Sequence, residues 1–146
     1  MDPVTLTPQA VAALIDHTLL KPDATGAAVR RLCAEAREHG CATVCVNPYW
    51  VELAVGEGVS VATVVGFPLG ANETAIKVAE AERAVRAGAR EIDMVLNVGD
   101  RVAGNLRVVG DDIRSVVACG APVKVIFETA LLNEAQKRQA CELSRA

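Results

Sequence analysis

Short apolar runs recur along the chain, and each is followed by a segment with helical periodicity. Runs this short and largely uncharged are typical of strands in a parallel sheet that is covered on its faces. Strand and helix segments that alternate in this way predict an α/β fold. The strand-like segments are five: residues 15–20, 42–46, 61–65, 91–97 and 123–128.

The clearest helical segment covers about residues 25–39, and Gly40 is a plausible stop. Four of its apolar side chains recur at the spacing of one helical face: Val29, Leu32, Cys33 and Ala36. In a later helix, Glu73 and Lys77 are spaced to form an ion pair across one turn. Further helices are predicted near residues 7–14, 49–55, 73–87, 106–119 and 133–145.

Two architectures fit five strand–helix units in a single domain spanning residues 1–146. One is an open, doubly wound sheet, and the other is part of a (β/α) barrel. The sequence contains no G-x-G-x-x-G after a strand, and no G-x-x-x-x-G-K-[ST], H-E-x-x-H or G-x-S-x-G motif. The lack of a phosphate fingerprint disfavours nucleotide ligands.

Charged residues interrupt two of the apolar strands. Asp93 lies in the segment 91–97, and Lys124 lies in the segment 123–128. Aspartate is depleted in strands and resists burial, so its presence needs an explanation. An acid and a base in separate apolar strands indicate proton-transfer chemistry in a dry interior. The structural alternative is a strand-edge aspartate that faces water and a lysine that extends from a strand end.

Other polar candidates lie at comparable positions in the first two units. Asp16 and Thr18 fall in the first strand, and Cys45 falls near the end of the second. Ligand sites of parallel sheets form where the carboxyl ends of several strands meet. Asp16 could equally be a turn or capping residue, and a small buried hydrophobe is favoured over a nucleophile for Cys45. Strand alternation points His17 away from both Asp16 and Thr18.

Composition narrows the function classes. Fifteen basic and eighteen acidic residues give a net charge of −3, which offers no electrostatic footprint for nucleic acid or a membrane surface. The five cysteines form no C-x-x-C pair and no zinc spacing, so reduced thiols and no metal are expected. The start at Met1–Pro3 lacks the features of a signal peptide. These features predict a cytoplasmic protein.

Five motifs resemble those of deoxyribose-phosphate aldolases in their order and spacing. The segments IDHTLLKP and EIDMVL are the specific ones, whereas the other three would be weak alone. The resemblance runs from about residue 15 to the last residue. The motifs are IDHTLLKP at 15–22, VCV at 44–46, VVGFPLG at 64–70, EIDMVL at 91–96 and KVIFET at 124–129.

The resemblance implies a (β/α)₈ barrel and a class I aldolase that uses a lysine Schiff base, without a metal or other cofactor. Its substrate is the sugar phosphate 2-deoxy-D-ribose 5-phosphate, which it cleaves to glyceraldehyde 3-phosphate and acetaldehyde in deoxyribonucleotide catabolism. By the resemblance, Asp93 is the catalytic acid/base, and Asp16 is a second aspartate that contacts the substrate. Cys45 and Lys124 match residues that line the pocket, and Thr18 is included among the substrate-binding residues.

The sequence departs from the family at the nucleophile. In the family, the Schiff-base lysine lies on the sixth strand in a Lys-Thr-Ser-Thr-Gly-type motif, which these 146 residues do not contain. Lys124 belongs to a different strand and is not taken as its substitute. We therefore expect an N-terminal portion of an aldolase barrel that is inactive alone. It is expected to form a homo-oligomer or to associate through its open edges. The alternative is a non-catalytic aldolase-like fragment that binds a sugar phosphate or assembles with a partner chain.

Overall fold

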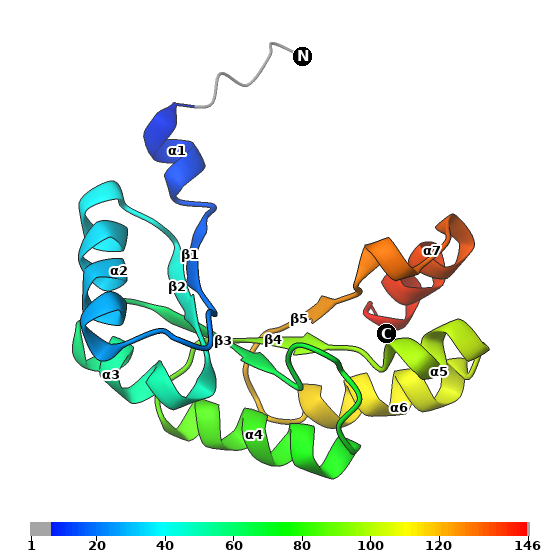
Figure 1. Ribbon diagram of the computed structural model, residues 1–146. Coiled ribbons are helices and arrows are strands. Elements are labelled where there is room, and N and C mark those ends of the chain that lie inside the picture. The colour runs from blue at the N-terminus through cyan, green and yellow to red at the C-terminus, as the bar shows by residue number, and fades with distance from the viewer. Residues whose placement is uncertain (1–6, 146) are drawn as a thin grey trace.

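The computed structural model describes residues 7–145 as a sheet of five parallel strands with helices around it (Figure 1). Each strand pairs with the next strand along the chain, in the order β1-β2-β3-β4-β5. The segment Met1–Pro3, in which no signal-peptide features were found, lies outside the described residues. The strands are β1 Asp16–Leu19, β2 Thr43–Val46, β3 Val61–Val65, β4 Glu91–Val95 and β5 Val123–Ile126.

The helices alternate with the strands as the sequence predicts, with one addition. The addition is α5, a six-residue helix directly after β4 that the sequence pattern did not predict. Among residues 7–145, no helix has the length and apolar character that crossing a bilayer requires. The helices are α1 Pro8–Ala12, α2 Gly26–His39, α3 Val51–Gly56, α4 Thr74–Arg86, α5 Val98–Ala103, α6 Leu106–Val117 and α7 Glu134–Leu143, with short 3₁₀ turns η1 Pro48–Trp50 and η2 Thr129–Leu131.

The sequential strand order decides between the two architectures. A doubly wound sheet reverses direction at a switch point, whereas a barrel adds each new strand on the same side. Here β1 and β5 are the two edges, and within the described residues the sheet is not closed. Figure 1 shows α2, α3, α4 and α6 along the outside of the curved sheet. The fold is therefore a partial (β/α) barrel.

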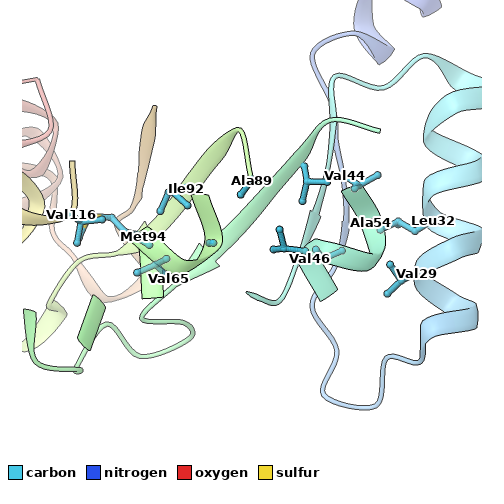
Figure 2. Close-up of a cluster of buried hydrophobic side chains, with 14 of the residues drawn as sticks. Val29, Leu32, Val44, Val46, Ala54, Val65, Ala89, Ile92, Met94 and Val116 are labelled. Atoms are coloured by element: carbon cyan, nitrogen blue, oxygen red, sulfur yellow. The ribbon is translucent and has the colours of Figure 1, made fainter. Parts of the chain in front are cut away.

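The main core lies between the sheet and this outer layer of helices. In α2, Val29, Leu32 and Cys33 are buried, as their spacing predicted. Val44 and Val46 of β2 are fully buried on the side of the sheet that faces α2 and α3 (Figure 2). Thr25 caps the start of α2 through its side chain. This packing fixes which face of each strand is left for the barrel interior.

A buried ion pair joins α4 to α6 and to the end of β4. The Nζ atom of Lys77 lies 2.6 Å from Oδ2 of Asp112 and donates to the carbonyl oxygen of Val95 at 3.1 Å. The predicted Glu73–Lys77 pair is wrong. Lys77 points inward and has no exposed surface, whereas Glu73 precedes the first turn of α4. Thr74 completes the arrangement by donating to Oδ1 of Asp112 at 2.8 Å.

The loop between β3 and α4 is pressed against the end of β4. Gly70 has a φ of +66°, and its N–H donates to the carbonyl oxygen of Gly66 at 2.7 Å. A Cβ atom at position 70 would lie 2.0 Å from the carbonyl oxygen of Leu96. Glycine is required here by both the backbone conformation and this close approach. The loop that follows β3 is thus held near the carboxyl end of β4.

Candidate active site

The inner face of the sheet carries a small apolar cluster of its own. Cys45, Ala62 and Val64 are buried together, and Leu20 and Ile126 pack against them. Because side chains alternate along a strand, residues two positions away on the same strands also face the interior. Lys124 is such a residue, two positions before Ile126 on β5. Asp93 of β4 faces the same side, because it is aligned with Val64 of β3 and with Lys124 of β5.

Lys124 lies among three carboxylates. Its Nζ atom is 2.7 Å from Oδ2 of Asp16, 2.7 Å from Oε1 of Glu91 and 3.2 Å from Oδ1 of Asp93. Oxygens of the three acids lie within 4.8 Å of one another. The side chains come from β1, β4 and β5, so the curvature of the sheet brings its two edge strands into contact through this one ammonium group.

Asp93 is the most enclosed of the three acids, with 8% of its surface exposed. Burial raises the pKa of its carboxyl above the ordinary value, and the charge of Lys124 opposes that effect in part. The charges of Glu91 and Asp16 add to the increase. The Sγ atom of Cys45 lies 3.7 Å from Oδ2 of Asp93 as a weak donor. A carboxyl in this setting suits proton transfer.

Asp16 accepts two strong hydrogen bonds. Lys124 donates to its Oδ2 atom, and the Thr43 hydroxyl donates to its Oδ1 atom at 2.6 Å. Burial alone would raise the pKa of Asp16, but these hydrogen bonds and the Lys124 charge outweigh it and lower the pKa. Asp16 is therefore a stable carboxylate, and the alternative of a simple turn or capping residue does not describe its contacts.

Thr18 is not drawn into the ion cluster. Its hydroxyl donates to the backbone carbonyl of Asp16 at 2.7 Å, and the residue is exposed. His17 points to the opposite side of the strand, where its Nε2 atom lies 2.8 Å from Glu35 of α2. That orientation confirms the alternation predicted for β1. The structure thus brings Asp16, Cys45, Asp93 and Lys124 together, whereas the Thr18 side chain bonds to its own strand and not to the ion cluster.

The two potential nucleophiles of the cluster are held in unreactive forms. Burial would lower the pKa of Lys124, but the hydrogen bonds to Asp16 and Glu91 and the charge of Asp93 raise it above its ordinary value. Burial and the nearby charge of Asp93 raise the pKa of the Cys45 thiol to about 12. A cationic amine and a neutral thiol are poor nucleophiles. In this structure Cys45 packs on the inner face of the sheet, and Lys124 is the charge partner of the three acids.

Two members of the cluster were missed by the sequence analysis. Glu91 precedes Asp93 by two residues, and Thr43 precedes Cys45 by two, so strand alternation could have placed both on the inner face. Asn97, which shares the face of Asp93 by the same rule, instead caps α5 by accepting from the N–H of Asp100 at 3.1 Å. Carboxylates such as Asp16, Glu91 and Asp93 also suit a divalent cation, but the Lys124 ammonium already lies among them.

Parallel β/α units that add sequentially around a curved sheet, with an acid–base cluster on the inner face, define the architecture of a (β/α)-barrel enzyme. The model of the DeoC/LacD family aldolases matches residues 10–139. The chain belongs to this aldolase family.

Individual relatives agree with the family. A deoxyribose-phosphate aldolase of Brevibacillus brevis is 53% identical over 136 residues, which are 89% of this chain and 62% of the relative. A similar enzyme of Desulfitobacterium hafniense is 49% identical over 144 residues, covering 93% of this chain and 66% of that relative. The chain therefore spans less than two thirds of the length of these relatives.

A solved structure shares the fold over nearly the same range. The tetrameric deoxyribose phosphate aldolase from Aeropyrum pernix superimposes with a TM-score of 0.84 at 33% identity. The match covers 95% of this chain and 61% of that one. The predicted fold class, a partial barrel of the (β/α)₈ type, is confirmed.

Proposed function

We propose that this chain supplies the acid–base part of a Schiff-base aldolase site that cleaves 2-deoxy-D-ribose 5-phosphate to glyceraldehyde 3-phosphate and acetaldehyde in the cytoplasm. The observation that carries the proposal is the enclosed Asp93 carboxyl beside the Lys124 ammonium on the inner face of the partial barrel. The resemblance of the EIDMVL segment and the names of the relatives support the same substrate.

In this proposal Asp93 moves protons during formation and loss of the covalent intermediate. A neutral amine adds to the substrate carbonyl to give a carbinolamine, which must lose water to become an iminium ion. Asp93 protonates the departing hydroxyl and then accepts protons in the steps that follow. When the C2–C3 bond breaks, the C3 hydroxyl loses its proton to a base and becomes the aldehyde of glyceraldehyde 3-phosphate, while the bonding pair forms the C1=C2 double bond of an enamine and the iminium pair returns to nitrogen. Protonation of the enamine at C2 gives an iminium ion again, and water hydrolyses it to acetaldehyde and the free amine.

The amine itself is assigned to a lysine outside these 146 residues, since Lys124 is held as a cation by three carboxylates. Lys124 and Asp16 are proposed to bind the polar groups of the substrate, and Cys45 to line the pocket beside them. Thr18, which is exposed and aligned with Cys45 of β2, is proposed to contact the substrate. The chain alone is then expected to be inactive.

Borohydride trapping tests this assignment. The chain alone is treated with 2-deoxy-D-ribose 5-phosphate and borohydride, beside a chimera that continues residues 1–146 with the remaining segment of the Brevibacillus brevis relative. Mass spectrometry is expected to find no adduct on the chain alone and an adduct on the added segment of the chimera. In the chimera, Asp93→Asn is expected to lower turnover by at least about 100-fold, while the exposed control Glu38→Gln is expected to leave turnover unchanged. An adduct on Lys124 would contradict the proposal.

The second candidate is a non-catalytic module that binds a sugar phosphate or assembles with a partner chain. Its support is that the Lys-Thr-Ser-Thr-Gly-type motif is not among these residues. It predicts that titration calorimetry detects 2-deoxy-D-ribose 5-phosphate binding to the chain, and that the chimera forms no borohydride adduct. An active chimera would dismiss it.

A further inference from the structure

The ion cluster holds more acids than bases. Asp16, Glu91 and Asp93 contribute three carboxyl groups, and Lys124 is the cation within reach of all three. With every group ionised, the cluster carries two uncompensated negative charges next to the apolar cluster of Cys45. Like charges this close favour protonation of one of the acids, and the acid with the weakest stabilisation of its charged form is the one that takes the proton.

The contacts rank the three acids. Asp16 is stabilised as a carboxylate by Lys124 at 2.7 Å and by the Thr43 hydroxyl at 2.6 Å. Glu91 lies 2.7 Å from the same ammonium, and over a quarter of its side chain is exposed to water. Asp93 lies farther from the ammonium, at 3.2 Å, and its side chain is the most enclosed of the three, with 11% of its surface exposed to water. Asp93 therefore has the least support for its charge.

We propose that Glu91 is a positioning residue that makes Asp93 the proton carrier of this site, by drawing the Lys124 ammonium toward itself and adding a negative charge beside Asp93. Glu91 reaches the lysine from the strand that carries Asp93, two residues earlier. The ammonium lies 0.5 Å closer to Glu91 than to Asp93, as the distances of 2.7 Å and 3.2 Å show. Replacing Glu91 by a neutral residue frees the ammonium to approach Asp93.

The other groups around Asp93 do not by themselves account for the weaker stabilisation of its charge. Asp16 of β1 also binds Lys124, but the charge of Asp16 is stabilised by the Thr43 hydroxyl as well. From β2, the Cys45 thiol is a weak neutral donor 3.7 Å away. Strand β3 contributes Ala62 and Val64, which carry no charge. Glu91 is thus the acid whose charge depends most on Lys124 and is nearest in sequence to Asp93.

The catalytic use of this arrangement rests on the proposed function, because a residue that both gives and takes protons must be protonated for part of the time. The arrangement itself does not depend on that function. It concerns how the charge of Glu91 affects the protonation of Asp93, which is measurable in the chain without substrate or turnover. Failure of the aldolase proposal and failure of this one are therefore separate outcomes.

Carbon-13 NMR titration of the carboxyl groups tests the proposal in the protein itself. In the wild type, Asp93 is expected to titrate at a higher pH than Asp16, because Asp93 is more deeply buried and Asp16 accepts hydrogen bonds from Lys124 and Thr43. In Glu91→Gln, the pKa of Asp93 is expected to fall by about one unit, because one negative neighbour is lost and the ammonium is freed. The control Glu38→Gln replaces an exposed glutamate of α2 and is expected to leave the pKa of Asp93 unchanged.

Two results would overturn the proposal. One is an Asp93 titration that does not move in a Glu91→Gln protein whose backbone amide spectrum is otherwise that of the wild type. The other needs no variant and so covers the case in which Glu91→Gln does not fold. It is a wild-type titration in which Asp16 holds its proton to higher pH than Asp93.

Discussion

Lys124 and Cys45 show how the surroundings of a residue decide its chemistry. By residue type both are potential nucleophiles, yet one is surrounded by carboxylates and the other is buried beside Asp93. The sequence located both because a lysine and a cysteine are conspicuous in apolar strands. It could not show their protonation, which depends on contacts made across the sheet by residues far apart in the chain.

The thiol of Cys45 is expected to resist alkylation in the folded protein. It is 3% exposed, and its pKa of about 12 leaves almost no thiolate at neutral pH. Iodoacetamide at neutral pH should modify the exposed Cys141 first, and Cys45 only after unfolding in urea. Peptide mass spectrometry measures both. Modification of Cys45 at the rate of Cys141 would show that the site is open.

Asp16 is expected to make the stability of the protein pH-dependent at acidic pH. Its pKa in the folded state lies below the ordinary value of 3.8, so its ionised form stabilises the fold above that value and the contribution disappears as the pH falls through the folded-state pKa. Asp16→Asn should therefore be less stable than the wild type at neutral pH, and the difference should shrink as the pH falls below about 4. Urea denaturation across this range measures it, and a constant difference would contradict the prediction.

At the scale of elements, the sequence predicted most boundaries but not the contacts between helices. The apolar spacing in α2 identified its buried face, because that signal is local. Lys77 was assigned a partner on its own helix, whereas its partner lies 35 residues away on α6. A lysine at an inward position has no sequence signature that names its distant partner. Glu91 is a second example, because nothing in the sequence around this first residue of β4 names Lys124 of β5 as its partner.

The Lys77–Asp112 pair is expected to matter for stability mainly when it is broken. Lys77→Ala leaves a buried aspartate without its cation and should cost about 3–5 kcal/mol of unfolding free energy. Replacing both residues, by Lys77→Met and Asp112→Leu, should recover most of that loss. Urea denaturation measures each variant. Arg107→Ala, which removes an exposed partner of Asp111, is the control and should change little.

Two glycines with similar backbones separate the effect of conformation from that of contact. Gly70 and Gly104 both have positive φ, at +66° and +83°, but an added Cβ meets the Leu96 carbonyl in the first case and nothing within 4 Å in the second. Gly104→Ala should cost about 1 kcal/mol for its backbone conformation. Gly70→Ala should cost clearly more, because the loop must leave the end of β4. Equal losses in thermal unfolding would contradict this reading.

At the scale of the whole molecule, the sequence alone left an open sheet and a barrel as alternatives. Apolar runs fix the number of strands but not their order, which is a property of long-range pairing. The structure gives the sequential order and the unclosed edges, and the family resemblance had pointed to the same architecture.

The open edges β1 and β5 are expected to drive association of the chain when it is isolated. Unpaired strand edges present free backbone donors and acceptors to other chains. Analytical ultracentrifugation of residues 1–146 should show a mass that rises with concentration, whereas the chimera described above should have a fixed mass. A stable monomer with aldolase activity would contradict the partial-barrel reading.

The sequential strand order also bears on how the chain reaches its folded state. Each strand finds its partner one β/α unit earlier, so structure can grow along the chain by contacts of modest sequence separation. The Lys124–Asp16 pair is different, because it joins residues 108 positions apart. A contact this far apart in sequence brings little stability until the units between its two ends have formed, so this pair is expected to form late. A fluorescent donor and acceptor placed on β1 and β5 would therefore report the final step of folding.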